Sequence, residues 1–240
     1  MIKELSLIKN FWSYISNGIY SVGCTGQTVY VYDKDSNECA KFKDLRYAYY
    51  SAISPNGKLF VVKSTEGRLA VYSLESLSLI KKFRFSKVDG AQDDGYCFTN
   101  DSKWFINLER HKDDLHTAIS WYDTENFERT HFLQLDDNTM IQEIEQSADE
   151  IIYALGFYRG KTGNEPFVGI INESGICQSH IITEAEENYY LALYNARRAG
   201  FASRQWEWAY VDFMDFEEMK SSNHSFKKLY AYYQNKEGAD

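Results

Sequence analysis

The stretch Ile53–Ser73, ISPNGKLFVVKSTEGRLAVYS, decides the fold prediction. It places a Ser-Pro-Asn-Gly turn before an apolar run, and a second tight turn at Ser64–Arg68 before another apolar run. This order is typical of two antiparallel strands. A similar stretch stands at Ile15–Asp33, ISNGIYSVGCTGQTVYVYD. A chain that repeats such a unit is predicted to have a repeat architecture.

The unit occurs five times along the chain. Each copy opens with a polar turn and an apolar strand, and it later closes a strand with two bulky apolar residues and a small polar one. Taking Tyr20, Phe60, Phe105, Ile152 and Tyr190 as equivalent gives spacings of 40, 45, 47 and 38 residues. Most copies hold about four short strands, which over a period of about 40–45 residues is typical of a propeller blade. The predicted repeats are residues 11–46, 47–87, 94–135, 140–182 and 183–234.

The second copy, SPNGKLFVVKSTEGRLAVYS, resembles a WD40 or YVTN-type β-propeller repeat. Trp121-Tyr122-Asp123 is similar to the Trp-Asp-like pair that closes such repeats, although no histidine follows a glycine as in the Gly-His dipeptide of many WD40 blades. The repeats and the resemblance together predict an all-β protein. We expect a single domain, residues 1–240, that is a small β-propeller of about five four-stranded blades with a degenerate last blade, in which Glu184–Arg198 also fits a helix. Residues 1–10 are expected to pair into that blade, with Phe226–Gln234 as the competing candidate.

Composition and charge restrict the function classes. The 240 residues are 44% hydrophobic and include 19 Tyr and 15 Phe but only 2 Pro, a content that favours strands. The formal charge of −9 argues against nucleic-acid binding, which needs a basic surface. Residues 101–190 hold 18 acidic and 6 basic residues, a net charge of −12. This segment forms either a solvated acidic face or a docking surface for a basic partner.

The N-terminal segment and the cysteines predict a cytoplasmic protein. MIKELSLIKNFWSYIS lacks the unbroken apolar run of a signal peptide, and no segment reaches the length of an apolar membrane span. The four cysteines are far apart and form no CxxC pair, which indicates free thiols in a reducing compartment. They are Cys24, Cys39, Cys97 and Cys177.

Several stretches imitate sites without meeting their requirements. Gly156–Thr162 is one residue short of a phosphate-binding loop and leads into another predicted strand. The polar run Asp33–Glu38 lacks the glycine of a calcium loop. His111–His116 matches no zinc spacing. We therefore predict no catalytic residue, no cofactor and no metal, while Glu143 and Glu145 remain candidates for cavity carboxylates.

The predicted binding face consists of the loops between the two best-marked strands of each copy. These loops are short in the first two copies and longer at 109–117, 159–166 and 195–205. Equivalent loops emerge on one face of a propeller, and loops on a rigid scaffold carry function. The predicted partner-binding residues are Arg110, His111, Asp113, Asp114, Arg159, Arg197, Arg198, Arg204 and Trp206.

These observations predict a non-catalytic propeller that binds another protein, with an inhibitor of a basic partner as the narrower hypothesis. An immunity protein that covers a toxin nuclease would be such an inhibitor. One alternative is a five-bladed propeller that binds or cleaves a glycan. The other is a structural subunit that assembles through an unpaired edge strand, so the protein is expected to be a monomer or an edge-strand dimer.

Overall fold

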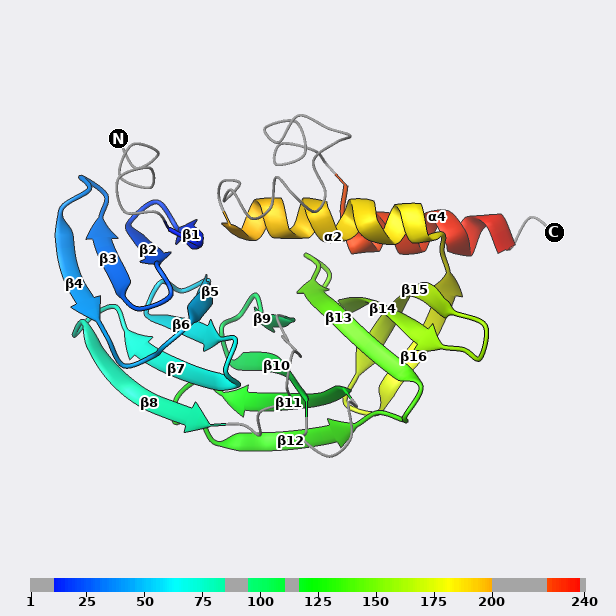
Figure 1. The fold of residues 1–240 in the computed structure, drawn as a ribbon, viewed down its shortest axis with the longest axis horizontal. Helices are drawn as coiled ribbons and strands as arrows, with labels where there is room; N and C mark the ends of the chain where they lie inside the picture. The colour runs from blue at the N-terminus through cyan, green and yellow to red at the C-terminus, as the bar shows by residue number, and fades with distance from the viewer. Residues whose placement is uncertain (1–10, 85–94, 111–116, 200–223, 238–240) are drawn as a thin grey trace. The chain divides into compact units, whose positions relative to one another are not determined.

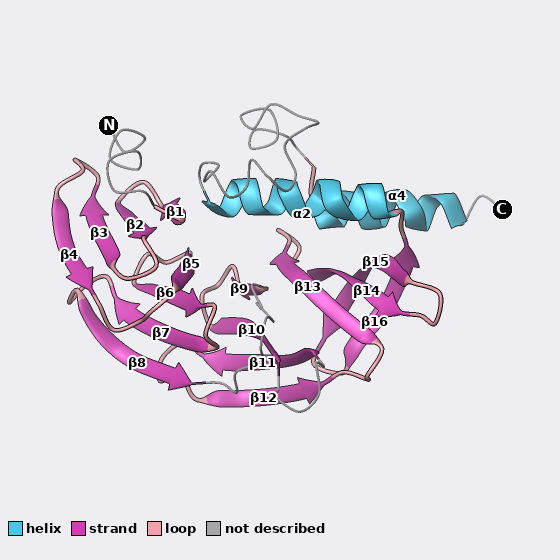
Figure 2. Ribbon diagram, viewed as in Figure 1, coloured by secondary structure: helices cyan, strands magenta, loops and turns pink. Residues whose placement is uncertain are grey.

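A computed structural model of the chain describes residues 11–84, 95–110, 117–199 and 224–237. These residues form an all-β, propeller-like fold of four antiparallel sheets, each with four strands, and two helices (Figures 1 and 2). The chain divides into two compact units. Unit 1 contains sheets A and B, and unit 2 contains sheets C and D, helix α4 and residues 184–194 of helix α2.

In each sheet the strands follow one another in sequence order, so neighbours in the chain are also neighbours in the sheet. Sheet A consists of β1 (Ser13–Ser16), β2 (Tyr20–Cys24), β3 (Val29–Asp33) and β4 (Glu38–Phe42). Sheet B consists of β5 (Ala48–Ile53), β6 (Leu59–Ser64), β7 (Arg68–Ser73) and β8 (Ser78–Arg84).

Unit 2 repeats this arrangement and adds the helices. Sheet C consists of β9 (Tyr96–Phe98), β10 (Trp104–Arg110), β11 (Thr117–Asp123) and β12 (Arg129–Gln134). Sheet D consists of β13 (Thr139–Gln146), β14 (Ile152–Arg159), β15 (Asn164–Asn172) and β16 (Gly175–Ile181). The helices are α2 (Glu184–Ala199) and α4 (Phe226–Glu237).

The repeated polar turn joins the first two strands of sheets B, C and D through the same side-chain bond, from a Ser or Thr hydroxyl to an Asn or Asp Oδ1. In sheet B, the Ser54 hydroxyl donates to Asn56 Oδ1 at 2.7 Å and accepts from the Leu59 N–H. In sheet C, the Thr99 hydroxyl donates to Asp101 Oδ1, also at 2.7 Å. Gly57 has φ +72° in this turn, a conformation that favours glycine. Short hydroxyl and Asn or Asp side chains therefore form the turn that the sequence repeats.

The fourth strand of each sheet carries a β-bulge opposite the two bulky residues that close the third strand. The register shifts between Val31 and Tyr32, and it shifts at the equivalent place in the other three sheets. A bulge adds one residue to the edge strand and increases its twist. The closing residues of the repeat thus mark the position at which the fourth strand bends.

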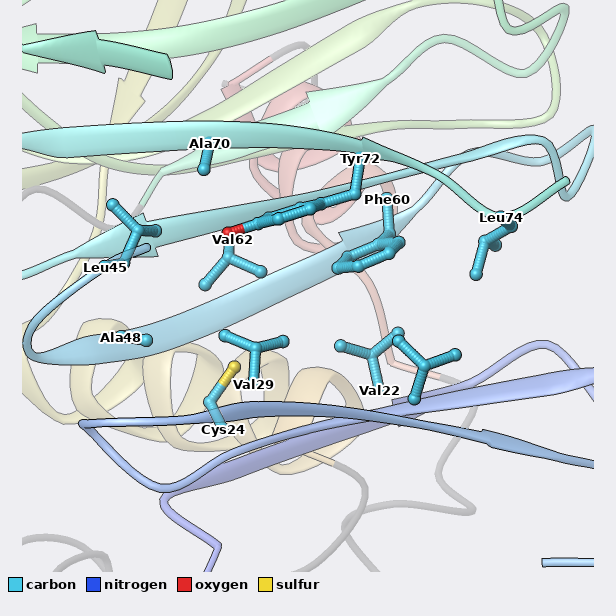
Figure 3. Packing of buried hydrophobic residues seen from close by; sticks show 11 residues of the cluster. Val22, Cys24, Val29, Leu45, Ala48, Phe60, Val62, Ala70, Tyr72 and Leu74 are labelled. Carbon is cyan, nitrogen blue, oxygen red and sulfur yellow. The ribbon is translucent and has the colours of Figure 1, made fainter. Parts of the chain in front are cut away.

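The core of unit 1 lies between sheets A and B (Figure 3). Phe60 and Tyr72 stack with ring centroids 4.6 Å apart, and both are fully buried. Val22, Cys24 and Val29 of sheet A point toward these rings in Figure 3. A strand that is covered on both faces has a continuous apolar sequence.

The core of unit 2 has two parts. Between sheets C and D, Ile106, Leu108 and Ile119 pack with Ile141 and other apolar residues of β13, β14 and β15. The opposite face of sheet D is covered by α4, which contacts β14, β15 and β16. The ring of Tyr230 lies on Tyr153, with centroids 5.6 Å apart, and on His180, with centroids 4.7 Å apart. A helix therefore covers one face of the fourth sheet.

Two parts of the sequence prediction need correction. Tyr20 is not equivalent to Phe60. In sheet B, Phe60 pairs with the closing residue Tyr72. The equivalent closing residue in sheet A is Tyr32, and it pairs with Ser21. The hydrogen bond from the Asn17 N–H to Tyr20 O encloses two turn residues, whereas the bond from the Ser54 N–H to Leu59 O encloses four. The register of the second strand is therefore displaced by one residue, and a slip of one residue moves a side chain to the other face of a sheet.

The second correction concerns the predicted fifth repeat, where the proposed strand around Tyr190 is wrong. Residues 184–199 and 226–237 are helical. Thr183 begins α2 with a capping box, in which its N–H and hydroxyl donate to Glu186 Oε2 and its Oγ1 accepts from the Glu186 N–H. The candidate closing segment Phe226–Gln234 also lies in a helix, whereas residues 1–10 lie outside the described residues. The single-domain boundary and a fifth blade stay predictions.

Candidate functional site: an acidic rim on unit 2

Most of the predicted partner-binding residues cannot be placed. His111, Asp113, Asp114, Arg204 and Trp206 lie outside the described residues. Arg110 is the last residue of strand β10, where its backbone pairs with Thr117. Arg197 and Arg198 belong to helix α2, so the predicted loop at 195–205 is wrong over its first five residues.

Arg159 is the predicted binding residue whose side chain is described. It ends β14, where its N–H donates to Asn138 O at 2.7 Å. Its Nη2 lies 3.1 Å from Met140 Sδ, so the half-buried guanidinium leans along the start of β13. The loop that follows is a hairpin in which Gly160 donates its N–H to Gly163 O. This geometry agrees with the interpretation of Gly156–Thr162 as a turn.

The motifs that imitate a metal or cavity site can be placed among the described residues. Within these ranges, no group of three or more His, Cys, Asp or Glu side chains is placed to hold a metal ion. Asp33 Oδ1 accepts the N–H groups of Asp35 and Asn37, as in an ordinary polar turn. Of the two candidate cavity carboxylates, Glu143 is buried and Glu145 accepts the N–H of Phe226 at the start of α4, at 2.5 Å. Glu145 therefore serves as a helix cap.

An acidic rim lies at one end of sheets C and D. The turns after the first and third strands of an antiparallel sheet emerge at the same end, and in both sheets these turns carry carboxylates. Most of these side chains are exposed, and Asp123 is half-buried. The acidic rim consists of Asp101, Asp123, Glu125, Glu128, Asp149, Glu150 and Glu173.

Hydrogen bonds join the turns of the rim to one another. Within sheet C, Thr124 donates its N–H to Lys103 O at 3.0 Å and its hydroxyl to Ser102 O at 2.6 Å. Between the sheets, Asn100 donates its side-chain amide to Ser147 O at 2.8 Å. A further bond at 2.7 Å links His131 Nε2 to Glu173 O. The rim is therefore one connected surface of unit 2.

Local bonds hold rim carboxylates in the ionised state. The backbone N–H of Lys103 and the hydroxyl of Thr99 lower the pKa of Asp101. Hydrogen bonds from Lys227 and Ser147 lower the pKa of Asp149. A carboxylate that accepts hydrogen bonds is stabilised in its charged form. These hydrogen bonds therefore favour the charged forms of Asp101 and Asp149.

The cations near the rim are each engaged by a carboxylate. Lys103 Nζ lies 3.3 Å from Asp101, and Lys227 Nζ lies 2.7 Å from Asp149. Arg129 Nη1 lies 3.7 Å from the buried Glu109, whose Oε1 also accepts the hydroxyl of Tyr122 at 2.6 Å. Burial raises the pKa of Tyr122, and the negative charge of Glu109 raises it further. Together with Glu109, the seven rim carboxylates outnumber the three cations Lys103, Lys227 and Arg129, which leaves a surplus of negative charge.

The two units differ in charge. The described residues of unit 1 hold twelve basic and six acidic residues, whereas those of unit 2 hold eight basic and seventeen acidic residues. The net charges are +6 and −9. The sequence indicated the acidic segment but not the rim, because the rim forms only when turns of two repeats meet.

Comparisons with known proteins concern the fold. No protein family matches the sequence, and no curated protein does. Hydrazine synthase of Kuenenia stuttgartiensis is similar in structure, with a TM-score of 0.56, 13% identity, and coverage of 70% of this chain and 52% of that chain. A structure of a eukaryotic initiation factor matches with a TM-score of 0.48, 17% identity, and coverage of 71% and 43%. The chain thus spans about half the length of these proteins.

The similarity to the hydrazine synthase structure supports a propeller-like all-β fold for this chain. At 13% identity it concerns the fold alone. Neither described helix combines the length and the apolar character needed to cross a membrane.

Proposed function

We propose that this chain is a non-catalytic binding protein whose acidic rim docks a basic protein partner. The observation that carries the proposal is the connected row of seven rim carboxylates on hydrogen-bonded turns, near three cations that are each engaged by a carboxylate. Such a surface attracts a basic partner and orients it before contact. Because the turns are held by their own hydrogen bonds, the charges are already in position before the partner arrives.

A narrower form of the proposal is a dedicated inhibitor of the immunity type. An acidic surface that covers a basic nuclease would occupy the place of the nucleic-acid phosphates. We also assign the repeats to the WD40 or YVTN-like class, on the basis of the turn and closing motifs. A cytoplasmic location is supported by the free thiols of Cys39 and Cys177, which are exposed.

The test uses three forms of the full chain. The rim variant combines Glu125→Lys, Glu150→Lys and Glu173→Lys, whose side chains are exposed. The control variant makes the same change in net charge at Asp35→Lys, Glu75→Lys and Glu165→Lys, which lie outside the rim. Each form is used to capture partners from native extract at low salt and at about 0.5 M salt, where charge attraction is screened.

One basic protein should be captured in stoichiometric amount by the wild type and by the control. After purification, that protein should bind the rim variant at least about tenfold more weakly, and high salt should weaken its binding to the wild type. For the inhibitor hypothesis, the captured protein should cleave nucleic acid until one equivalent of this chain is added. A partner that binds all three forms equally at both salt concentrations would contradict the proposal.

A further inference from the structure

Strand β16 is an edge strand without the usual protection. Its sequence, GICQSHI, contains no Lys, Arg, Asp, Glu or Pro, whereas β4, β8 and β12 each carry at least one charged residue. Natural proteins normally place charges or proline on exposed edges, because an unpaired edge accepts a further strand. The bulge at Cys177 affects only the beginning of β16, and residues 178–181 keep a regular register.

The outward backbone groups of β16 can be assigned from its pairing. Ile182 donates its N–H to Pro166 O at 2.9 Å, and backbone groups alternate in direction along an antiparallel strand. Ser179 and Ile181 therefore direct their N–H and C=O groups away from β15. No other strand among the described residues pairs with this side of β16. The Ile181 side chain is also 50% exposed.

A groove of about 440 Å³ runs beside this edge, between β12 of sheet C and β16 of sheet D. Leu133, Leu135 and Ile176 give it apolar walls, and Gln178 and Asp136 add polar groups. Asp136 Oδ1 accepts the N–H of Asn138 and the hydroxyl of Thr139, both at 2.9 Å, which fixes the position of the carboxylate. The lining includes no lysine or arginine.

We propose that β16 binds an extended segment of a basic partner protein as a fifth strand of sheet D. The backbone of the segment pairs with Ser179 and Ile181, and alternate apolar side chains enter the groove against Leu133 and Ile176. A lysine or arginine of the segment reaches Asp136. This inference rests on the proposed function and specifies how part of the partner binds.

The charge of the groove selects this occupant over a second copy of the chain. A copy that added its own β16 would bring no lysine or arginine to Asp136, because that strand contains neither, and its one histidine, His180, is buried. An extended segment with alternating apolar residues and one cation satisfies both the edge and the carboxylate. Backbone pairing would supply affinity, and the groove and Asp136 would supply selectivity.

The experiment selects phage-displayed random 12-residue peptides on the immobilised full chain. Two variants at Ser179 separate the contribution of its backbone N–H to binding from that of its side chain. Ser179→Pro removes the outward N–H, and proline is tolerated on an edge strand when its N–H would face solvent. Ser179→Ala keeps this N–H and removes the hydroxyl, which bonds to the Tyr158 hydroxyl at 2.8 Å. A third variant, Asp136→Asn, removes the charge.

We expect the selected peptides to alternate apolar with other residues and to carry a lysine or arginine. Their affinity should fall at least about tenfold on Ser179→Pro, which corresponds to the loss of one backbone hydrogen bond and the added ring. Their affinity for Ser179→Ala should stay within about threefold of the wild type. Asp136→Asn should weaken peptides that carry the cation and leave otherwise identical neutral peptides unchanged.

A second measurement does not depend on whether Ser179→Pro folds. The amide hydrogens of Ser179 and Ile181 should exchange quickly in the free wild type and slowly when a selected peptide is bound. Equal binding to the wild type and Ser179→Pro, unchanged exchange at these amides, or the absence of enriched peptides would overturn the inference. So would a doubled molecular mass that excludes the peptides. Peptides sensitive only to the rim variant would overturn it while leaving the proposed function standing.

Discussion

Sheet B packs one face against the preceding sheet, and sheet D does the same against sheet C but also buries its opposite face against a helix. In unit 1, the face of sheet B that carries Phe60 and Tyr72 packs against sheet A (Figure 3). In unit 2, the face of sheet D that carries Tyr153 and His180 packs against helix α4. Figure 1 shows α4 in red alongside α2, and Tyr233 of α4 donates its hydroxyl to Glu186 of α2 at 2.6 Å.

The difference shows that a repeat specifies its own sheet but not what covers it. The Ser54 turn and the Tyr72 closing pair produce four strands in sheet B, and their equivalents do the same in sheet D. The covering layer depends on the next segment of the chain. A sheet-on-sheet contact is a broad interlocked core, whereas the helix contact depends on a few aromatic residues and polar bonds.

The largest expected effect is at the centre of the sheet-on-sheet contact. Phe60→Ala removes a ring that is fully buried and stacked on Tyr72, so the free energy of unfolding should fall by about 3–5 kcal/mol. Denaturant unfolding measures this loss, and hydrogen exchange should place it in sheets A and B. Leu79→Ala, on the outer strand of sheet B and 39% exposed, serves as the control. A loss no greater than that of the control would contradict this account of the core.

The helix contact should show a smaller and more local effect. Tyr230→Ala removes a buried ring from Tyr153 and His180, and we expect a loss of about 3 kcal/mol. Hydrogen exchange should increase in α4 and in β14–β16. Tyr232→Ala is the matched control on the same helix, because Tyr232 is 58% exposed. If Tyr230→Ala increased exchange equally in sheets A and B, the helix would not be a local cover.

The first four repeats were predictable because their turns and closing pairs recur. Ser54, Asn56 and Gly57 form a turn with strict side-chain requirements, so the motif survives in a single sequence. The apolar run Tyr189–Leu193 was misread, because a short apolar run fits a strand or a buried helix equally well. The Thr183-x-x-Glu186 capping box is the sequence signal that favours a helix here.

The candidate site was much less predictable than the fold. The loop lengths predicted a binding face that includes His111 and Trp206, which lie outside the described residues. The acidic rim instead uses the short turns that also build the fold, so Asp101 looked like part of a structural motif. Its contribution to a surface follows only from contacts between distant turns, such as the bond from Asn100 to Ser147.

The smallest expected effect tests whether the helical layer depends on pH. Glu187 of α2 is 9% exposed, and burial raises its pKa from 4.5 to about 7, with a further contribution from Glu184. A carboxyl whose pKa is raised by folding contributes stability below about pH 4.5, and this contribution is lost as the pH rises through 7. The free energy of unfolding should therefore fall between about pH 5 and pH 8.

Glu187→Gln should remove this dependence, because the amide stays neutral throughout. A raised pKa of this size corresponds to at most about 3 kcal/mol, and relaxation around the charge reduces the expected gain at pH 8 to about 2 kcal/mol. Urea unfolding at pH 5 and pH 8 compares the variant with the wild type, and Glu165→Gln provides an exposed control outside α2. The core between sheets A and B contains no carboxylate, so it should not contribute to this dependence. Parallel pH profiles for Glu187→Gln and the wild type would show that Glu187 is ionised in the folded protein, and the contrast between the two covers would then be one of packing alone.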